Sequence, residues 1–383
     1  MISLAFKMLI GKKASCIGVI FGIFLATLLI SQQSAIFLGL MARSYRIVTD
    51  TPEPTIWVMD PATESEDKLR SMPLNYLDIV RKTPGIDWAV PLSSTLLPIT
   101  TPSGKFDITQ LYGVDDATLI GAPSLMLQGS VKDLRRSGGI IVDEFSARGV
   151  LSTVTHDGVR HDLQLGETLE INGKRAVVVG ICKITQNFYP QPIIYTSFSE
   201  FQIFNPGMTY RTGFILAKTN PSADIPAITK AINEHPGLRA YSREEFKNQV
   251  MSFFLKTGVL INFGLSVILG IIIGFSISGQ IFYMMTLENI TYYALIKAVG
   301  GTGKMILKMI IFQAAVVGII GFSLGMGLTV LWGLAIKDTT LAFLFPWQLL
   351  LFSGGIVLLI CIFTAILSAQ KVFKADPKIL MGT

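Results

Sequence analysis

The chain has 383 residues, of which 50% are apolar and 15% are charged, and its mean hydropathy is +0.54. This composition excludes an ordinary soluble protein and predicts several membrane spans. The net charge of +6 does not indicate nucleic-acid binding, because residues 43–250 carry 21 basic and 23 acidic side chains and the positive excess lies near the predicted spans.

Four stretches contain no Asp, Glu, Lys, Arg or His: residues 14–42, 257–287, 309–336 and 339–370. Each is longer than the roughly 20 residues that a helix needs to cross a bilayer. We therefore predict four transmembrane helices, with only a short turn at residues 337–338 between the last two. The first run is too long for a signal-peptide core, which favours a retained span over a cleaved leader.

Basic residues predict the orientation of the spans. They cluster in residues 1–13, 288–308 and 371–383, so we place these segments and both termini in the cytoplasm and residues 43–250 in the periplasm. Residues 1–13 alternate apolar and polar side chains, which predicts a helix lying in the membrane interface. The lysines that carry this argument are Lys7, Lys12, Lys13, Lys297, Lys304, Lys308, Lys371, Lys374 and Lys378.

The predicted fold class is an integral membrane α-helical protein with a large mixed α/β domain, residues 43–250, between the first and second spans. Asn172-Gly173 between two β-prone runs predicts a hairpin. Further strands are expected at residues 140–142 and 193–195. Helices are expected at residues 74–82 and 223–234, the second with Ser222 as its N-cap.

The last helix of this domain begins with a capping box, Ser242 followed three residues later by Glu245. No proline follows until well past the second span. We therefore predict one rigid stalk helix that starts at residue 243, includes Leu255 and continues to about residue 285.

Small residues recur at four-residue spacing on two spans, and such rows let helix backbones approach closely. They predict either packing within the chain or a dimer interface, and the spacing does not choose between the two. The residues are Ser266, Gly270, Gly274 and Ser278 on the second span and Gly321 and Gly325 on the third.

The sequence argues against a nucleotide-binding loop, a metal site and a catalytic set. Gly301-Thr302-Gly303-Lys304 is not a phosphate loop, because Ala298 and Met305 stand where that loop needs a glycine and a hydroxyl residue. The pairs His156-Asp157 and His161-Asp162 lack a metal-ligand spacing. We expect no metal site, no cofactor bound by this chain and no catalytic set. Three isolated cysteines, Cys16, Cys182 and Cys361, do not predict a disulfide framework.

The segment between the second and third spans, residues 288–301, reads ENITYYALIKAVGG. With the layout of the spans, it resembles the coupling segment of the permease subunits of the MacB/LolC/FtsX-like ABC transporter family, here most similar to DevC-type permeases without a fused ATPase. Leu165-Gly166-Glu167, Val179-Gly180 and the tail from Ser368 to Asp376-Pro377 resemble the same family. Residues 289–293 depart from the Arg and Glu that many members carry there, and only Glu288 is kept.

The resemblance implies that a separate ABC ATPase dimer, which holds ATP and magnesium, docks on this segment. It further implies a second permease copy, a periplasmic adaptor, an outer-membrane TolC-like channel, surrounding lipids and a Gram-negative inner membrane. ATP hydrolysis would move the periplasmic domain, a mechanism called mechanotransmission. The predicted coupling residues are Glu288, Tyr292, Tyr293, Ala294, Leu295, Ile296, Lys297, Ala298, Val299, Gly300 and Gly301.

We therefore predict a non-catalytic permease subunit for efflux or for lipid or glycolipid export, with an unknown substrate-binding site. One alternative within the family is lipoprotein release or the control of cell-wall hydrolases. An alternative of another class is a membrane sensor. Against a sensor, the longest predicted cytoplasmic segment, residues 288–308, is too short for a signalling domain.

Overall fold

The computed structural model describes residues 2–154, 160–189, 191–337, 339 and 341–374. The chain divides into two compact units. One, here called the membrane bundle, comprises Met1–Leu40 and Gly258–Thr383, and the other, the α/β domain, comprises Met41–Thr257. The predicted tail residues 375–383, and with them Asp376-Pro377, lie outside the described residues, as do His156 and Asp157.

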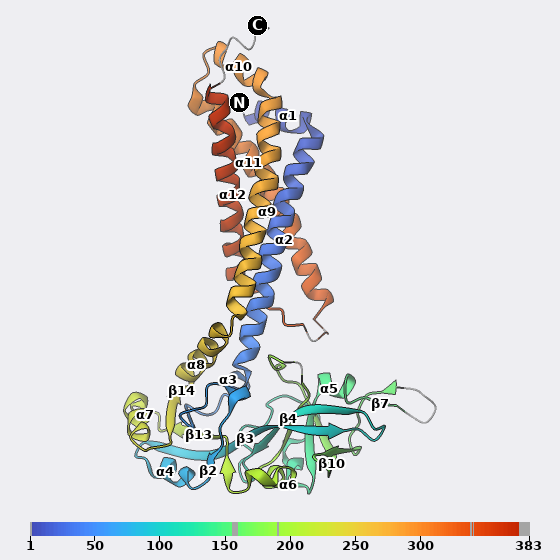
Figure 1. The fold of residues 1–383 in the computed structure, drawn as a ribbon, viewed down its shortest axis with the longest axis vertical. Coiled ribbons are helices and arrows are strands. Elements are labelled where there is room, and N and C mark those ends of the chain that lie inside the picture. The colour runs from blue at the N-terminus through green and yellow to red at the C-terminus, as the bar shows by residue number, and fades with distance from the viewer. Residues whose placement is uncertain (1, 155–159, 190, 338, 340, 375–383) are drawn as a thin grey trace. The chain divides into compact units, whose positions relative to one another are not determined.

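Four helices of the membrane bundle are long and apolar enough to span a membrane, and Figure 1 draws them as long helices in one group. They confirm four predicted spans. The helices of this unit are α1 (Ile2–Gly11), α2 (Lys13–Ser44, whose last residues belong to the α/β domain), α9 (Val259–Glu288), α10 (Ile290–Ala298), α11 (Gly303–Ala335) and α12 (Trp347–Lys374).

The connection between α11 and α12 is longer than predicted. Helix α11 ends at Ala335 and α12 begins at Trp347, so the fourth span does not begin at residue 339 and the turn is not confined to residues 337–338. Part of the connection lies along α2: the amide of Leu344 donates to the carbonyl oxygen of Ala35 at 3.0 Å, and the backbone at Phe343 packs against Gly39. Contacts with another helix thus hold this apolar stretch in a non-helical conformation.

The small residues of the spans pack against α2. A Cβ atom at Gly270 or Gly274 would meet Leu29 or Ala26, and one at Gly321 or Gly325 would meet Ile23 or Thr27. Ser278 is buried and lies beside Gly22. Gly270, Gly274 and Ser278 on α9 and the two glycines on α11 therefore serve packing within the chain, with α2 as their shared partner, whereas Ser266 bonds to Asn262 of its own helix.

The α/β domain contains a ten-stranded sheet in the order β14-β1-β13-β3-β4-β11-β6-β10-β5, with β9 pairing with β10 and β3. The strands are β1 (Ile56–Met59), β2 (Met72–Pro73), β3 (Ile86–Thr100), β4 (Phe106–Val114), β5 (Met126–Gly129), β6 (Gly139–Asp143), β7 (Thr153–Val154), β8 (Arg160–His161), β9 (Thr168–Ile171), β10 (Lys174–Cys182), β11 (Ile193–Ser197), β12 (Arg211–Thr212), β13 (Phe214–Thr219) and β14 (Arg239–Ser242).

The long strand β3 joins two hydrophobic cores. Its first half pairs with β13 and its second half with β4. One core lies under α4 and α7 and includes Ile56, Val80 and Ile228, and the other includes Leu97, Ile194 and Phe201. The helices of this unit are α3 (Arg46–Asp50), α4 (Tyr76–Lys82), α5 (Glu144–Arg148), α6 (Phe198–Phe204), α7 (Ile225–Asn233), α8 (Arg243–Lys256) and the 3-10 helices η1 (Glu66–Lys68), η2 (Val131–Arg135) and η3 (Pro206–Met208).

The Asn172-Gly173 hairpin is confirmed between β9 and β10, and both residues have the positive φ that its tight turn requires, 49° and 75°. The predicted strands at 140–142 and 193–195 are confirmed as β6 and β11. The predicted helix 223–234 is shorter, because Pro226 is accepted only in the first turn; the helix begins at Ile225, and its N-cap is Asp224 and not Ser222.

The prediction of one continuous stalk helix is wrong. The capping box of Ser242 and Glu245 is present and α8 begins at Arg243, but α8 ends at Lys256. The hydroxyl of Thr257 donates to the carbonyl of Phe254 at 2.6 Å, and Gly258 takes a left-handed φ of 85°, after which α9 starts at Val259. Glycine ends the helix here as effectively as proline would.

Candidate coupling helix and buried polar network

Helix α10 occupies the predicted coupling segment and ends in a Schellman motif. The amide of Gly301 donates to the carbonyl of Ile296 at 2.8 Å, and the amide of Gly300 donates to that of Lys297 at 3.1 Å. Gly300 has a φ of 95°, and a Cβ atom at Gly301 would meet the backbone carbonyl oxygen of Ile296 at 2.7 Å. Both glycines are therefore required by the backbone, and they fix where the helix stops.

One face of α10 is apolar and exposed. Tyr292, Leu295 and Val299 are 58%, 54% and 84% exposed, and their spacing of three and four residues puts them on one side of the helix. Ala298 is exposed as well. Tyr292 and Leu295 lie on α10 and Val299 is its C-cap, and three large exposed side chains side by side form a surface of the kind that partners cover.

The opposite face of α10 packs into the membrane bundle. Tyr293 and Ala294 are buried, and Ile296 and Lys297 are half-buried. The Tyr293 hydroxyl donates to Oε1 of Gln313 on α11 at 3.0 Å. Burial raises the pKa of Tyr293 to about 12, so the hydroxyl stays protonated and remains a donor.

Glu288, the last residue of α9, lies next to the start of α2. Its carboxylate accepts from Ser15 Oγ at 3.4 Å and lies 3.7 Å from Lys12 Nζ. Both Lys12 and Glu288 are partly exposed, so the ion pair itself contributes little stability. Its position shows that Glu288 faces the N-terminal helices and is not part of the exposed face of α10.

In the α/β domain, α8 is fastened to α3. Arg243 donates to the carbonyl oxygens of Val48 at 3.1 Å and Pro52 at 3.3 Å, and Lys247 Nζ lies 4.9 Å from the centre of the Tyr45 ring. Leu255, predicted as a stalk residue, is half-buried near the end of α8.

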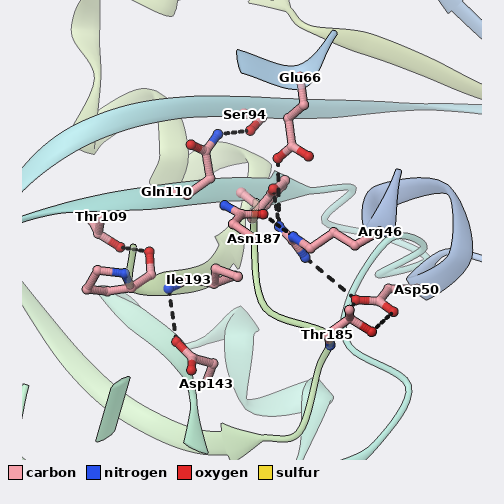
Figure 2. A network of polar contacts seen from close by, with 12 residues as sticks. Arg46, Asp50, Glu66, Ser94, Thr109, Gln110, Asp143, Thr185, Asn187 and Ile193 are labelled. Atoms are coloured by element: carbon pink, nitrogen blue, oxygen red, sulfur yellow. Dashed lines mark hydrogen bonds and ion pairs between the residues drawn. The ribbon is translucent and has the colours of Figure 1, made fainter. Parts of the chain in front are cut away.

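A buried polar network centred on Arg46, which the sequence did not reveal, lies at the start of the α/β domain. Figure 2 shows the guanidinium of Arg46 between Asp50 and Glu66, at 3.6 Å and 3.7 Å. It also donates to Asn187 and to the hydroxyl of Tyr112. Arg46 is 1% exposed, so these partners replace the water that a buried charge needs.

The network joins α3 to distant parts of the domain. Asp50 accepts from the amide and the hydroxyl of Thr185, and Tyr112 on β4 stacks on Tyr195 of β11 at 5.1 Å. Burial raises the pKa of Asp50, and Arg46 partly reverses that rise. In the sequence Arg46 is only one of the 21 basic residues of the segment 43–250, and no local pattern predicts its partners.

Nearby, Asp143 caps α5 and accepts from the amides of Ser146 at 2.9 Å and Ile193 at 3.0 Å. Burial raises its pKa. No group of three His, Cys, Asp or Glu side chains close enough to hold a metal ion occurs among the residues that the structure describes.

Two family models match the chain in sequence. The MacB-like periplasmic core domain matches residues 15–235, and the FtsX-like permease C-terminal domain matches residues 259–377. Among solved structures, the chain is similar to the periplasmic region of MacB from Actinobacillus actinomycetemcomitans, with 14% identity, 53% of this chain and 95% of that chain covered, and a TM-score of 0.39. The extracellular domain of the noncanonic ABC-type transporter YknZ from Gram-positive bacteria matches with 12% identity, 49% and 99% coverage, and a TM-score of 0.36.

Proposed function

The chain belongs to the MacB- and FtsX-like permeases of ABC transporters, and we propose that its helix α10 is the docking site of a separate ABC ATPase. Permeases of this family work with such an ATPase. In this proposal the chain hydrolyses nothing itself, and ATP and magnesium are held by the partner.

The exposed face of α10 is the observation that supports this proposal. Tyr292, Leu295 and Val299 stand out from a helix whose other side is fixed by Tyr293 and Ala294. An apolar stripe at this spacing fits a hydrophobic groove on a partner protein. The Schellman motif at Gly300 and Gly301 ends the helix where the third span begins, so a displacement of α10 acts directly on α9 and α11, to which it is joined by short connections.

We further propose that the complex works in efflux or in lipid or glycolipid export through a periplasmic adaptor and an outer-membrane channel, by mechanotransmission as in a DevC-type permease. The membrane would be a Gram-negative inner membrane with both termini in the cytoplasm, and two permease copies would flank an ATPase dimer. The absence of charged residues from the predicted spans supports a substrate that is not led through them by ionisable groups.

The break at Gly258 affects how a displacement of the spans would reach the α/β domain. Gly258 separates α8 from α9, so an uninterrupted stalk does not carry a displacement of the second span. The first span, α2, is unbroken from Lys13 to Ser44 and is followed directly by α3 and the Arg46 network. We propose that the first span is the stiffer of the two connections.

A photo-cross-linking amino acid at position 295 tests the docking site. In native membranes it should capture a protein with the sequence motifs of an ABC ATPase, whereas the same group at Leu125, 52% exposed in the α/β domain against 54% for Leu295, should not. In a second measurement, Leu295→Asp should abolish copurification of that ATPase while Leu125→Asp retains it. If neither position captures an ATPase under conditions that preserve other membrane complexes, the docking proposal fails and a membrane sensor becomes the better reading.

A further inference from the structure

Three helices of the membrane bundle meet in one chain of hydrogen bonds. The Tyr293 hydroxyl on α10 donates to Oε1 of Gln313 on α11 at 3.0 Å, and Nε2 of Gln313 donates to the carbonyl oxygen of Ala5 on α1 at 2.9 Å. All three residues are at most 1% exposed. Ala5 and Gln313 are 308 positions apart in the chain, so only folding brings them together.

Three buried threonines of the spans behave differently. Thr27 donates to Ile23, Thr286 to Phe282 and Thr329 to Gly325, each within its own helix. Such bonds satisfy a hydroxyl without connecting one helix to another. Gln313, in contrast, uses both ends of its amide to reach two other helices, and leaving such buried groups unpaired would be costly.

A second contact holds the same two regions together. Glu288, two residues before α10, lies 3.7 Å from Lys12 and accepts from Ser15. The contacts of Glu288 thus hold the end of α9 against Lys12 and the first turn of α2. The hydrogen bonds of Gln313 connect α10 to Ala5 of α1. Any movement of α10 must break these contacts or carry α1 with it.

We propose that Gln313 is a positioning residue of the coupling device: it fastens helix α10 to α11 and α1, so that the three helices move as one body when the ATPase displaces α10. The proposal rests on the proposed docking function of α10. It assigns to the N-terminal helix α1 a part in energy transfer, in addition to any role in the membrane interface.

The test uses the full chain in lipid nanodiscs with the ATPase captured as described above. The variants are Tyr293→Phe, which removes only the hydroxyl, and Gln313→Leu, which removes the amide at similar size. Their matched controls are Tyr283→Phe, half-buried on α9, and Gln280→Leu, exposed on α9. ATP hydrolysis is measured against permease concentration, which separates the half-maximal concentration from the maximal stimulated rate.

We expect Tyr293→Phe and Gln313→Leu to lower the maximal stimulated rate about tenfold while the half-maximal concentration changes less than about twofold, because the docking face is untouched. The maximal stimulated rate of the double variant should be no lower than that of Gln313→Leu alone, since both changes break the same chain of hydrogen bonds. The controls should behave as the unchanged protein.

A spectroscopic readout tests the positioning itself. With the native cysteines replaced, spin labels at Lys7 on α1 and Thr291 on α10 should give one narrow distance distribution, which Gln313→Leu should broaden and Gln280→Leu should not. Retained stimulation with a narrow distribution would overturn the proposal, as would additive losses in the double variant. If Leu295→Asp leaves ATPase binding intact, the docking site is wrong, and that result is distinct from a failure of the Gln313 bridge.

Discussion

The guanidinium of Arg243, the first residue of α8, donates to the carbonyl oxygen of Val48 on α3 at 3.1 Å. Helix α3 follows the first span in sequence, and α8 precedes the second. The two segments through which the α/β domain is connected to the membrane bundle are therefore fastened to each other inside the domain.

Replacing Arg243 by alanine should loosen α3. The change removes two hydrogen bonds from a charged donor, each worth about 1.5–3 kcal/mol, although partial exposure reduces the loss. We expect faster hydrogen exchange at residues 46–52 of the full chain in nanodiscs. Lys230→Ala, on the exposed side of α7, is the control and should leave that exchange unchanged. Equal exchange in both variants would show that α3 is held without Arg243.

Replacing Arg46 by methionine should destabilise the domain much more. It leaves the carboxylates of Asp50 and Glu66 beside an apolar side chain, and breaking a buried ion pair by removing one partner costs about 3–5 kcal/mol. The measurement is the free energy of local opening from hydrogen exchange in β4 and β11. Arg70→Met, at an exposed position, should change it by no more than about 0.5 kcal/mol. If Arg46→Met lowers the free energy of local opening by no more than Arg70→Met does, the network does not stabilise this part of the domain.

The stability of the domain should depend on pH through Asp143. Burial raises the folded-state pKa of Asp143 above its unfolded value of about 3.9, so between these two values the folded state binds more protons than the unfolded state. The contribution of Asp143 to stability is therefore greatest below the unfolded pKa and is lost as pH rises through the folded pKa. In Asp143→Asn, which does not titrate, this component of the slope should vanish. Hydrogen exchange in β6 and β11 from about pH 4 upward measures the difference, and parallel curves for the two proteins would refute it.

Two glycines near the start of α9 should respond oppositely to alanine. Gly258 has a φ of 85°, and an L-residue in that conformation costs about 1–2 kcal/mol. Gly264 lies in the interior of α9 with no atom within 4 Å of an added Cβ, so alanine there should stabilise the helix by about 1 kcal/mol. Thermal unfolding of the detergent-solubilised chain should therefore shift down for Gly258→Ala and up for Gly264→Ala. A rise for Gly258→Ala would mean that α8 and α9 join into one helix without cost.

Features that depend on neighbouring residues could be predicted from the sequence. The four apolar runs, the hairpin at Asn172-Gly173 and the capping box at Ser242 and Glu245 follow from composition and from rules a few residues long, and all are present. The break at Gly258 belongs to the same class. Lys256-Thr257-Gly258 is a helix-stop signal, but the absence of proline outweighed it in the prediction.

Contacts between distant residues were decided by the tertiary structure alone. The small-residue rows that contain Gly270 and Gly321 predicted close helix packing at these positions, and only the fold identified α2 as the helix that packs against them. In the sequence, Gln313 is one polar residue of the uncharged run 309–336 and Arg46 is one of the 21 basic residues of 43–250, and nothing local indicates the partner of either. Ala5 and Asn187 lie 308 and 141 positions away from them. Local patterns determine which segments become helices and strands, whereas a buried polar group is satisfied by whichever distant donor or acceptor the completed packing brings to it.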